Sequence, residues 1–210
     1  MLPASTVSAV ITLYLAAFFS VNAYNILVGG RERRDETLYA EVERPAGLMI
    51  GLAAMSTVLF FIESLLTVFL GFSGGRYDFL GPFPIPQSST LQSVGLGIMA
   101  LGFLLFIWSV VARGRYSLSW AMPRDHALVT WGPYRYIRHP SYMGYFLMFL
   151  SLPLIMLNPV ALLPLTGIPG YLSVARREEE LLIQRFGEEY RDYMDRTGGF
   201  LPRIVGREAI

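Results

Sequence analysis

The chain has 210 residues, 53% of them hydrophobic, and its 17 basic and 16 acidic side chains leave a net charge of +1. Its mean hydropathy of +0.45 exceeds what one soluble domain of this length can hide in a core, so the composition predicts a membrane protein. The absence of cysteine excludes disulfides, thiolate nucleophiles and cysteine-ligated metals, and the absence of lysine excludes a Schiff-base lysine. We predict no metal site and no nucleic-acid partner.

Three segments are apolar over the roughly 20 residues that a membrane-spanning helix requires: residues 7–28, 46–72 and 90–112. The first has no basic region before it and is too long for the apolar part of a signal peptide, so we expect a permanent helix. A fourth apolar region, residues 141–174, is broken by Asn158 and Pro159. Each half is short for a full span, which predicts two short helices or a hairpin that enters the bilayer and returns.

The arginines are distributed unevenly among the segments that connect these helices. Residues 29–45 hold four, residues 73–89 hold one, residues 113–138 hold five, and the tail from Arg176 holds seven. Because positively charged loops stay on the cytosolic side, this pattern predicts an N-terminus outside and the polar segments together on the cytosolic face.

The chain changes character after Val174. In ARREEELLIQRFGEEYRDYMDR, residues 175–196, apolar and aromatic side chains recur at helical spacing among charges. The pattern predicts an amphipathic helix, interrupted near Gly187, that lies at the membrane surface or folds back on the polar loop. A solvated, salt-bridged tail is the alternative.

The predicted fold is therefore an all-α integral membrane protein with about five transmembrane helices, namely three spans and a short helical hairpin. A cytosolic amphipathic C-terminal helix follows. We divide the chain into a three-helix membrane region, residues 1–112, and a catalytic region, residues 113–210. The catalytic region would comprise the cytosolic loop, the hairpin and a C-terminal cofactor-binding segment.

Glu63 lies inside the second predicted span, where an ionised carboxylate costs several kcal/mol unless it is paired or hydrated. Asn22 and Asn25 of the first span are candidate partners. Glu63 is expected either to join helices through a hydrogen bond or to line a substrate cavity.

A polar, aromatic cluster interrupts the apolar sequence at WGPYRYIRHPSYMGYF, residues 131–146. Proline suits the first turn of a helix and disfavours helical geometry at the preceding residue, so His139-Pro140 predicts the start of a helix. The free N–H groups of that turn attract a carboxylate or phosphate, and Arg135 and Arg138 add positive charge. The rings of this stretch offer faces for a purine or a cation: Trp131, Tyr134, Tyr136 and Tyr142. The alternative is an interfacial aromatic belt with snorkelling arginines.

Three consecutive glutamates, residues 178–180, follow the hairpin, whose topology returns them to the membrane face where His139 lies. A helix N-terminus, aromatic walls and facing carboxylates together suit a zwitterionic, cationic ligand that carries a purine. S-adenosylmethionine fits this description and is the predicted cofactor.

Two motifs in this region resemble isoprenylcysteine carboxyl methyltransferases and related membrane methyltransferases. GPYRYIRHPSYMG is similar to the family's GxYxxxRHPxYxG segment, and residues 178–193 are similar to its EExxLxxxFGEEYxxY segment. The Asn158-Pro159 turn and a later Leu201-Pro202 match too, and the resemblance covers residues 128–205. Where the family has Val-Pro after the last tyrosine, this chain has RTGGFLP, which leaves the docking of its tail open. The matching positions are Gly132, Tyr134, Arg138, His139, Pro140, Tyr142, Gly144, Glu178, Glu179, Gly187, Tyr190 and Tyr193.

The resemblance implies a helical membrane enzyme that binds S-adenosylmethionine from the cytosolic side, between the hairpin and the C-terminal segment. The candidate cofactor-binding residues are Tyr134, Tyr136, His139, Pro140, Tyr142, Gly144, Glu178, Glu179 and Tyr190. The candidate catalytic residues are Arg138 and Glu179. Because a carboxylate acceptor is already ionised, it needs no strong base. Arg138, or failing that Arg113 or Arg115, is expected to hold it by paired N–H bonds.

The expected reaction is methyl transfer to a lipophilic acceptor that enters from the bilayer, first of all the carboxylate of an isoprenylcysteine-like or prenylated substrate. One alternative is a phospholipid or small-lipophile N- or S-methyltransferase, in which His139 or a glutamate would act as a base. Two others are an NADPH-dependent enzyme similar to sterol reductases and a non-enzymatic membrane scaffold. Because eukaryotic members of the family carry additional helices, we expect a prokaryotic cell membrane, with the active site on its cytosolic face.

Overall fold

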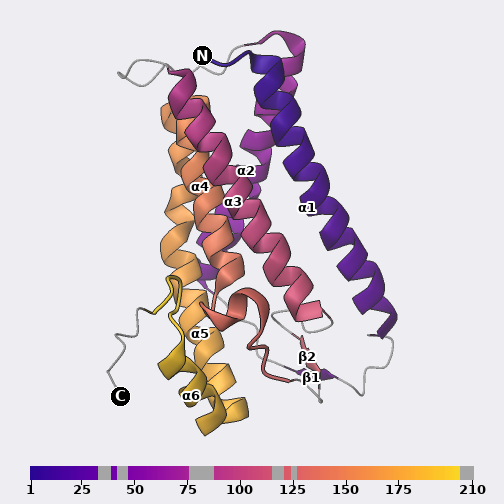
Figure 1. Cartoon of the computed structure of the whole chain (residues 1–210), viewed down its shortest axis with the longest axis vertical. Helices are drawn as coiled ribbons and strands as arrows, with labels where there is room; N and C mark the ends of the chain where they lie inside the picture. Colours follow the sequence, from indigo (N-terminus) through magenta and orange to yellow (C-terminus); the bar gives the residue numbers. More distant parts are fainter. Residues whose placement is uncertain (33–38, 42–46, 76–87, 115–120, 124–126, 204–210) are drawn as a thin grey trace, which may run out of the picture.

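The computed structural model describes residues 1–32, 39–41, 47–75, 88–114, 121–123 and 127–203. Its α-helices are α1 (Ala4–Glu32), α2 (Leu48–Ser73), α3 (Ser89–Arg113), α4 (Pro140–Met156), α5 (Ile168–Phe186) and α6 (Glu188–Arg196). The other described elements are the 3-10 helices η3 (Gly132–Arg135) and η4 (Pro159–Gly167) and the strands β1 (Tyr39–Glu41) and β2 (Ala121–Pro123). Figure 1 shows the long helices running along one axis, with η3, α6 and the strands at the end opposite the N-terminus.

The three predicted spans are confirmed. α1, α2 and α3 are each long and apolar enough to cross a membrane, and α4 is a shorter apolar helix. Large apolar side chains are exposed on the outer faces of the spans, among them Leu13, Phe69 and Leu104. Helices that are apolar all round suit a bilayer, where lipid covers such faces.

Aromatic rings fill the space between the helices. Phe103 of α3 contacts Phe18 of α1 at a ring-centre distance of 5.7 Å and Phe60 of α2 at 6.2 Å. Phe60 in turn contacts Phe149 of α4 at 5.8 Å. Lipid tails are as apolar as these side chains, so packing contacts of this kind hold the helices together.

α3 and α4 approach closely because both present glycine where they cross. A Cβ atom on Gly102 would lie 2.8 Å from the carbonyl oxygen of Gly144, and one on Gly144 would lie 2.8 Å from that of Gly102. Small residues let helix backbones meet in this way in membranes. Gly144, a predicted cofactor-binding residue, therefore lies in the contact between α3 and α4, and its position serves packing.

The predicted hairpin is present, and its turn lies at Asn158 as expected. α4 ends where Leu157 adopts a φ of 52°, and the side-chain oxygen of Asn158 accepts a hydrogen bond from the Ala161 N–H at 3.2 Å. The chain then continues as η4, a 3-10 helix of nine residues, before α5 begins.

α5 runs without interruption from the hairpin into the charged segment. The amphipathic helix predicted to begin near residue 175 is thus the second part of α5. Gly187, with a φ of 57°, ends α5 where the interruption was predicted, and α6 follows. The Tyr193 hydroxyl of α6 donates to the backbone oxygen of Tyr134 in η3 at 2.6 Å, so the prediction that this segment folds back on the polar loop is confirmed.

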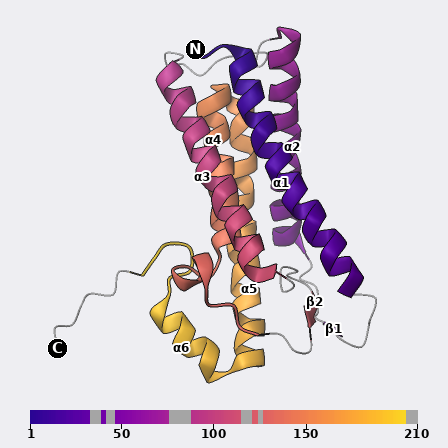
Figure 2. The ribbon, with the colours of Figure 1, turned by 45° about the vertical axis from the view of Figure 1, so that its right-hand side comes forward.

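β1 and β2 pair antiparallel, with Tyr39 opposite Pro123 and Glu41 opposite Ala121. This ribbon joins the segment after α1 to the segment after α3, at the end of the bundle where α6 lies (Figure 2). The predicted helical membrane fold is confirmed, and this ribbon is a small addition to it, because strands of three residues are too short to show a two-residue alternation in the sequence.

Candidate functional site

The loop between α3 and α4 is held against the end of α3 next to Gly132. Trp131 Nε1 donates to the Ala112 carbonyl at 2.9 Å, and Gly132 has a φ of 61°. A Cβ atom on Gly132 would lie 2.9 Å from the Ala112 Cβ, so the backbone conformation and the close approach both require glycine. This contact places Tyr134 beside Arg113, whose guanidinium carbon lies 5.9 Å from the centre of the Tyr134 ring.

The segment after α6 pairs with the loop that leads into α4. The Arg138 N–H donates to the Gly198 carbonyl at 2.8 Å, and the His139 N–H donates to the Gly199 carbonyl at 3.0 Å. Gly198 has no room for a side chain, because a Cβ atom there would overlap the Leu201 carbonyl. The RTGGFLP tail therefore docks on the motif loop, which the sequence left open.

Arg138 binds the protein's own chain. Its Nε donates to Oε1 of Glu179 at 2.7 Å, and its Nη1 donates to the carbonyls of Thr197 at 2.6 Å and Met194 at 3.2 Å. Its side chain is 13% exposed. The predicted role of Arg138, holding an acceptor carboxylate, stays a prediction. Because Nε and Nη1 already bind the protein, a paired bond from Arg138 to a carboxylate would have to replace one of these contacts. Arg138 ties α4 to α5 and to the end of α6.

His139 is 5% exposed and precedes Pro140, the first residue of α4, as predicted. Its Nε2 lies 3.0 Å from Oε1 of Glu179. Its ring stacks on Tyr142 and on Phe200, at ring-centre distances of 5.7 and 5.4 Å. These rings and Glu179 hold the imidazole in place, and Nδ1 is its ring nitrogen on the Glu178 side.

The two neighbouring glutamates of α5 differ in how their charges are compensated. Glu178 accepts the Tyr142 hydroxyl at 2.7 Å and lies 3.8 Å from Nδ1 of His139. Burial raises the pKa of Glu178 above its ordinary value, although His139 and Tyr142 oppose the rise. Burial would also raise the pKa of Glu179, but hydrogen bonds from His139 and Arg138 outweigh it and lower that pKa. We name Arg138, His139, Tyr142, Glu178 and Glu179 the RHP cluster.

The remaining predicted cofactor-binding residues lie in different settings. Tyr190 is 1% exposed and packs on Tyr193 within α6. Pro140 is buried at the start of α4, and Tyr134 is buried in η3. Tyr136 is 53% exposed. The structure thus brings His139, Tyr142, Glu178 and Glu179 together. Tyr190 lies near enough to them for the charges of Glu179 and Arg138 to act on its pKa, whereas Tyr136 is exposed and Gly144 packs against α3.

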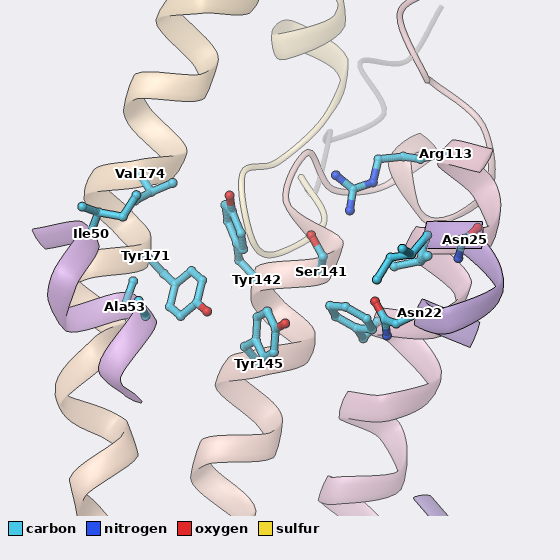
Figure 3. A pocket seen from close by; sticks show the side chains of 14 residues that line it. Asn22, Asn25, Ile50, Ala53, Arg113, Ser141, Tyr142, Tyr145, Tyr171 and Val174 are labelled. Atoms are coloured by element: carbon cyan, nitrogen blue, oxygen red, sulfur yellow. The ribbon is translucent and has the colours of Figure 1, made fainter. Parts of the chain in front are cut away.

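A cavity of about 340 Å³ lies beside the RHP cluster. Tyr142 belongs to the cluster and also lines the cavity. This volume is within the usual range for small-ligand sites. Its walls come from five helices, α1 to α5, and comprise Asn22, Asn25, Ile26, Ile50, Ala53, Ala54, Phe106, Val110, Arg113, Ser141, Tyr142, Tyr145, Tyr171 and Val174. Residues on both sides of the predicted division at residue 112 therefore build one site, shown in Figure 3.

One side of the cavity is aromatic. Tyr142, Tyr145 and Tyr171 lie together in Figure 3, and the rings of Tyr145 and Tyr171 stack at 5.3 Å. The Tyr171 hydroxyl shares a hydrogen bond with Thr57 of α2, which fixes its position. Sequence reasoning missed Tyr145 and Tyr171. The available signal was the three-residue step from Tyr142 to Tyr145, which puts both on one face of α4.

Two hydrogen-bond donors at the Arg113 end are buried and, among the residues that the structure describes, have no partner. They are Nε of Arg113 and the hydroxyl of Tyr134, and we name them the open donors. In Figure 3 the Ser141 hydroxyl points to the same side as the Arg113 guanidinium. Burial raises the pKa of Tyr134 above its ordinary value despite the opposing charge of Arg113, so the phenol keeps its proton at neutral pH. A buried donor without a partner costs free energy, so these groups mark a place suited to a ligand.

Glu63 lies apart from this cavity. It is 4% exposed, and neither carboxylate oxygen has a hydrogen-bond partner within the described part of the chain. The amide nitrogens of Asn22 and Asn25 donate to the carbonyls of Phe18 and Val21, one turn back in α1, at 2.8 and 2.9 Å. The predicted pairing of Glu63 with these asparagines is therefore wrong. Asn22 and Asn25 line the cavity instead, and Glu63 does not.

Comparison with known proteins points to one group of membrane enzymes. The phospholipid methyltransferase family matches residues 91–189. The protein-S-isoprenylcysteine O-methyltransferase of Tribolium castaneum is 30% identical over 160 residues, which cover 73% of this chain and 51% of that protein. Its counterpart in Dictyostelium discoideum is 40% identical over 83 residues, which cover 38% of this chain and 35% of that protein.

The solved structure of the eukaryotic intramembrane Ras methyltransferase, an isoprenylcysteine carboxyl methyltransferase, shares the fold. It matches with a TM-score of 0.50 at 24% identity, over 94% of this chain and 69% of that chain. The named relatives and the solved structure are therefore all similar to this chain and are all isoprenylcysteine methyltransferases. It spans about half the length of the Tribolium and Schizosaccharomyces pombe relatives that it matches.

Glu178 is the residue of the RHP cluster best suited to a cationic ligand. The Glu178 carboxylate is buried away from water, and its ion-pair partner, Nδ1 of His139, is 3.8 Å away. A positive group beside Glu178 would lower the cost of that burial. The residues present therefore fit a ligand with the ammonium and sulfonium groups of S-adenosylmethionine.

Proposed function

We propose that the chain is a membrane methyltransferase that transfers a methyl group from S-adenosylmethionine to the carboxylate of a lipophilic, isoprenylcysteine-like acceptor. One observation carries the proposal. A cavity among membrane-spanning helices has an aromatic side and, at one end, the guanidinium of Arg113 with an open donor. The apolar length suits a lipid tail, and the guanidinium suits a carboxylate.

The cofactor is assigned to the side of Tyr142 where the RHP cluster lies. S-adenosylmethionine supplies an electrophilic methyl group when it is bound. Glu178 would face its positive charge, while Glu179 and Arg138 hold His139 in place. Tyr136, Pro140 and Tyr190 stay predicted cofactor contacts.

Binding measurements test the role of Glu178 without relying on turnover. Titration calorimetry of Glu178→Gln against S-adenosylmethionine and S-adenosylhomocysteine distinguishes two contacts, because only the first ligand carries a sulfonium. Weaker binding of both ligands would identify the ammonium as the partner of Glu178, and weaker binding of the first alone would identify the sulfonium. Unchanged affinity for both would remove Glu178 from the site.

The acceptor needs orientation more than activation. A carboxylate is ionised at neutral pH and is already a nucleophile, so no residue has to remove a proton from it. Arg113 would hold the carboxylate at the end of the cavity, and Tyr145 and Tyr171 would pack along the tail. Fixed geometry and exclusion of water supply the acceleration in such a reaction.

The reaction centre is proposed to face the cytosol. α1, α3 and α5 run toward the end of the bundle that carries η3 and α6 (Figure 1), and the arginine-rich connecting segments follow the same helices. Positively charged segments stay inside, so the water-soluble cofactor would enter there and the acceptor would enter from the lipid. The prokaryotic origin stays a prediction.

A second candidate is methylation of a phospholipid amine, favoured by the match of residues 91–189 to the phospholipid methyltransferase family. The guanidinium of Arg113 disfavours this candidate. It repels the ammonium form of such a headgroup, whereas it attracts a carboxylate.

Transfer of labelled methyl groups by the full chain in lipid nanodiscs tests these alternatives. The acceptors are N-acetyl-S-farnesylcysteine, its carboxamide, N-acetyl-S-methylcysteine and phosphatidylethanolamine. We expect base-labile methyl ester from the first acceptor alone, because it has both the tail and the carboxylate. Methylation of phosphatidylethanolamine without ester formation would replace the proposal with the second candidate, and equal rates with and without the tail would exclude the cavity as the acceptor site.

A further inference from the structure

We propose that the Tyr134 hydroxyl and the Ser141 hydroxyl complete, with Arg113, a three-donor site for the acceptor carboxylate, and that Tyr134 belongs to the acceptor rather than to the cofactor. This inference rests on the proposed function. It assigns to Tyr134 and Ser141 a part in choosing a carboxylate over other headgroups.

The first argument is the incomplete bonding of this corner. The open donors are both buried, and Tyr134 as a whole is 7% exposed. Its backbone oxygen accepts the Tyr193 hydroxyl, so η3 is held firmly in place while the phenol oxygen has no partner among residues 1–32, 39–41, 47–75, 88–114, 121–123 and 127–203. Buried polar groups in folded proteins have partners as a rule. Tyr134 does not itself line the cavity, but Arg113, which lies over its ring, does, so a bound group at that end could reach the phenol.

The second argument is the convergence of donors from three elements. Arg113 ends α3, Tyr134 lies in η3, and Ser141 is the second residue of α4. Arg113 and Ser141 line the cavity, and the guanidinium carbon of Arg113 lies 5.9 Å from the centre of the Tyr134 ring.

The third argument is the chemistry of the set. The side chains of Arg113, Tyr134 and Ser141 can all donate hydrogen bonds. The Glu178 carboxylate is near enough to act on the pKa of Tyr134, but it already accepts the Tyr142 hydroxyl. A carboxylate offers about four lone-pair positions and can accept from several donors at once. An amide or an alcohol offers fewer acceptor positions and no charge. The arrangement therefore favours an ionised carboxylate.

Tyr134→Phe is the deciding variant, because it keeps the ring beneath Arg113 and removes only the hydroxyl. In the absence of cofactor, we expect its dissociation constant for N-acetyl-S-farnesylcysteine to rise about 10-fold or more, as for loss of a hydrogen bond to a charged group. Affinity for the corresponding carboxamide and for S-adenosylhomocysteine should stay within twofold. Ser141→Ala should show the same selectivity with a smaller rise.

The same variant separates a ligand contact from a structural one. Tyr134→Phe should leave the Tm of the ligand-free protein unchanged or raise it, since the lost hydroxyl has no partner within the described residues. Tyr193→Phe is the matched control. Its hydroxyl donates to the Tyr134 carbonyl at 2.6 Å, so its Tm should fall.

Three outcomes would overturn the inference. Weaker binding of S-adenosylhomocysteine to Tyr134→Phe would return Tyr134 to the cofactor, a lower Tm would make it a structural residue, and unchanged carboxylate affinity would exclude it from the acceptor site. Failure of the proposed function looks different, because wild-type protein would then form no methyl ester from any of the acceptors.

Discussion

The surroundings of Arg138 and of Arg113 differ in how completely their polar groups are bonded. Arg138 donates to Glu179, Thr197 and Met194 and is closed in by the protein. Arg113 lies at the end of a cavity, and its Nε is an open donor. Arg138 therefore joins parts of the protein to one another, whereas Arg113 keeps a buried N–H that can bind a ligand.

The difference shows how a motif residue can be essential without touching a substrate. Arg138 belongs to the sequence motif, but its fork orients Glu179, which in turn meets His139. Arg113 lies outside that motif, 26 residues before His139 by the printed numbering. Polar groups that already have hydrogen-bond partners stabilise the site, and the open donors are suited to bind a ligand.

The largest expected effect is on folding, from Arg138→Ala. The change leaves Glu179 without its closest cation and frees two carbonyls of the C-terminal segment, so we expect a loss of about 3 to 5 kcal/mol, as for breaking one side of a buried ion pair. Thermal unfolding in detergent and limited proteolysis after α6 measure it. A Tm within about 2 °C of the wild-type value would contradict the structural role of Arg138.

Arg113→Gln should instead spare the fold and impair the acceptor. The guanidinium contacts the face of Tyr134 and has no described ion pair to lose, so Tm should change little. We expect kcat/KM for a carboxylate acceptor to fall about 10- to 150-fold, from the loss of hydrogen bonds to a charged group. Arg113→Lys is the matched control. It should recover only part of the lost kcat/KM, because an ammonium cannot form paired hydrogen bonds to a carboxylate. Normal kinetics in Arg113→Gln would remove Arg113 from the acceptor site.

Stability against pH should separate the two glutamates of the RHP cluster. The lowered pKa of Glu179 gives a contribution that is present above the ordinary value of 4.5 and is lost as pH falls through the folded value. The raised pKa of Glu178 has the opposite sign, so its contribution is present below 4.5 and is lost as pH rises through the folded value.

Glu179→Gln should therefore lower the free energy of unfolding at pH 7 by about 1.5 to 3 kcal/mol, which lowers Tm. The difference in Tm between variant and wild type should narrow below pH 4.5. Glu178→Gln should gain stability relative to wild type as pH rises above that value, while it keeps an oxygen for Tyr142. If Tm changes with pH in the same way for wild type and both variants between about pH 4 and 8, the two glutamates do not differ in charge compensation as described.

The smallest expected effect comes from Phe200→Leu. Phe200 stacks on His139 at 5.4 Å and on Phe146 at 5.3 Å, and loss of an aromatic pair costs about 0.5 to 1.5 kcal/mol. Phe200→Tyr keeps both stacks and serves as the control. Equal Tm values for the leucine and tyrosine variants would show that stacking on His139 does not hold the tail.

The spans, the hairpin turn at Asn158 and the start of α4 at Pro140 could be predicted because each depends on a short stretch of sequence. The partners of Arg138 could not, since backbone carbonyls carry no sequence signal. The contribution of Asn22 and Asn25 to the cavity was also out of reach, because it depends on how α1 packs against the other helices.

A structure of the full chain with S-adenosylhomocysteine and N-acetyl-S-farnesylcysteine bound tests the central comparison most directly. We predict the acceptor carboxylate within hydrogen-bond distance of Nε of Arg113, with the bond between Arg138 and Glu179 still in place. A carboxylate bound to Arg138 instead, with Glu179 displaced and Arg113 without contact to the ligand, would contradict the account.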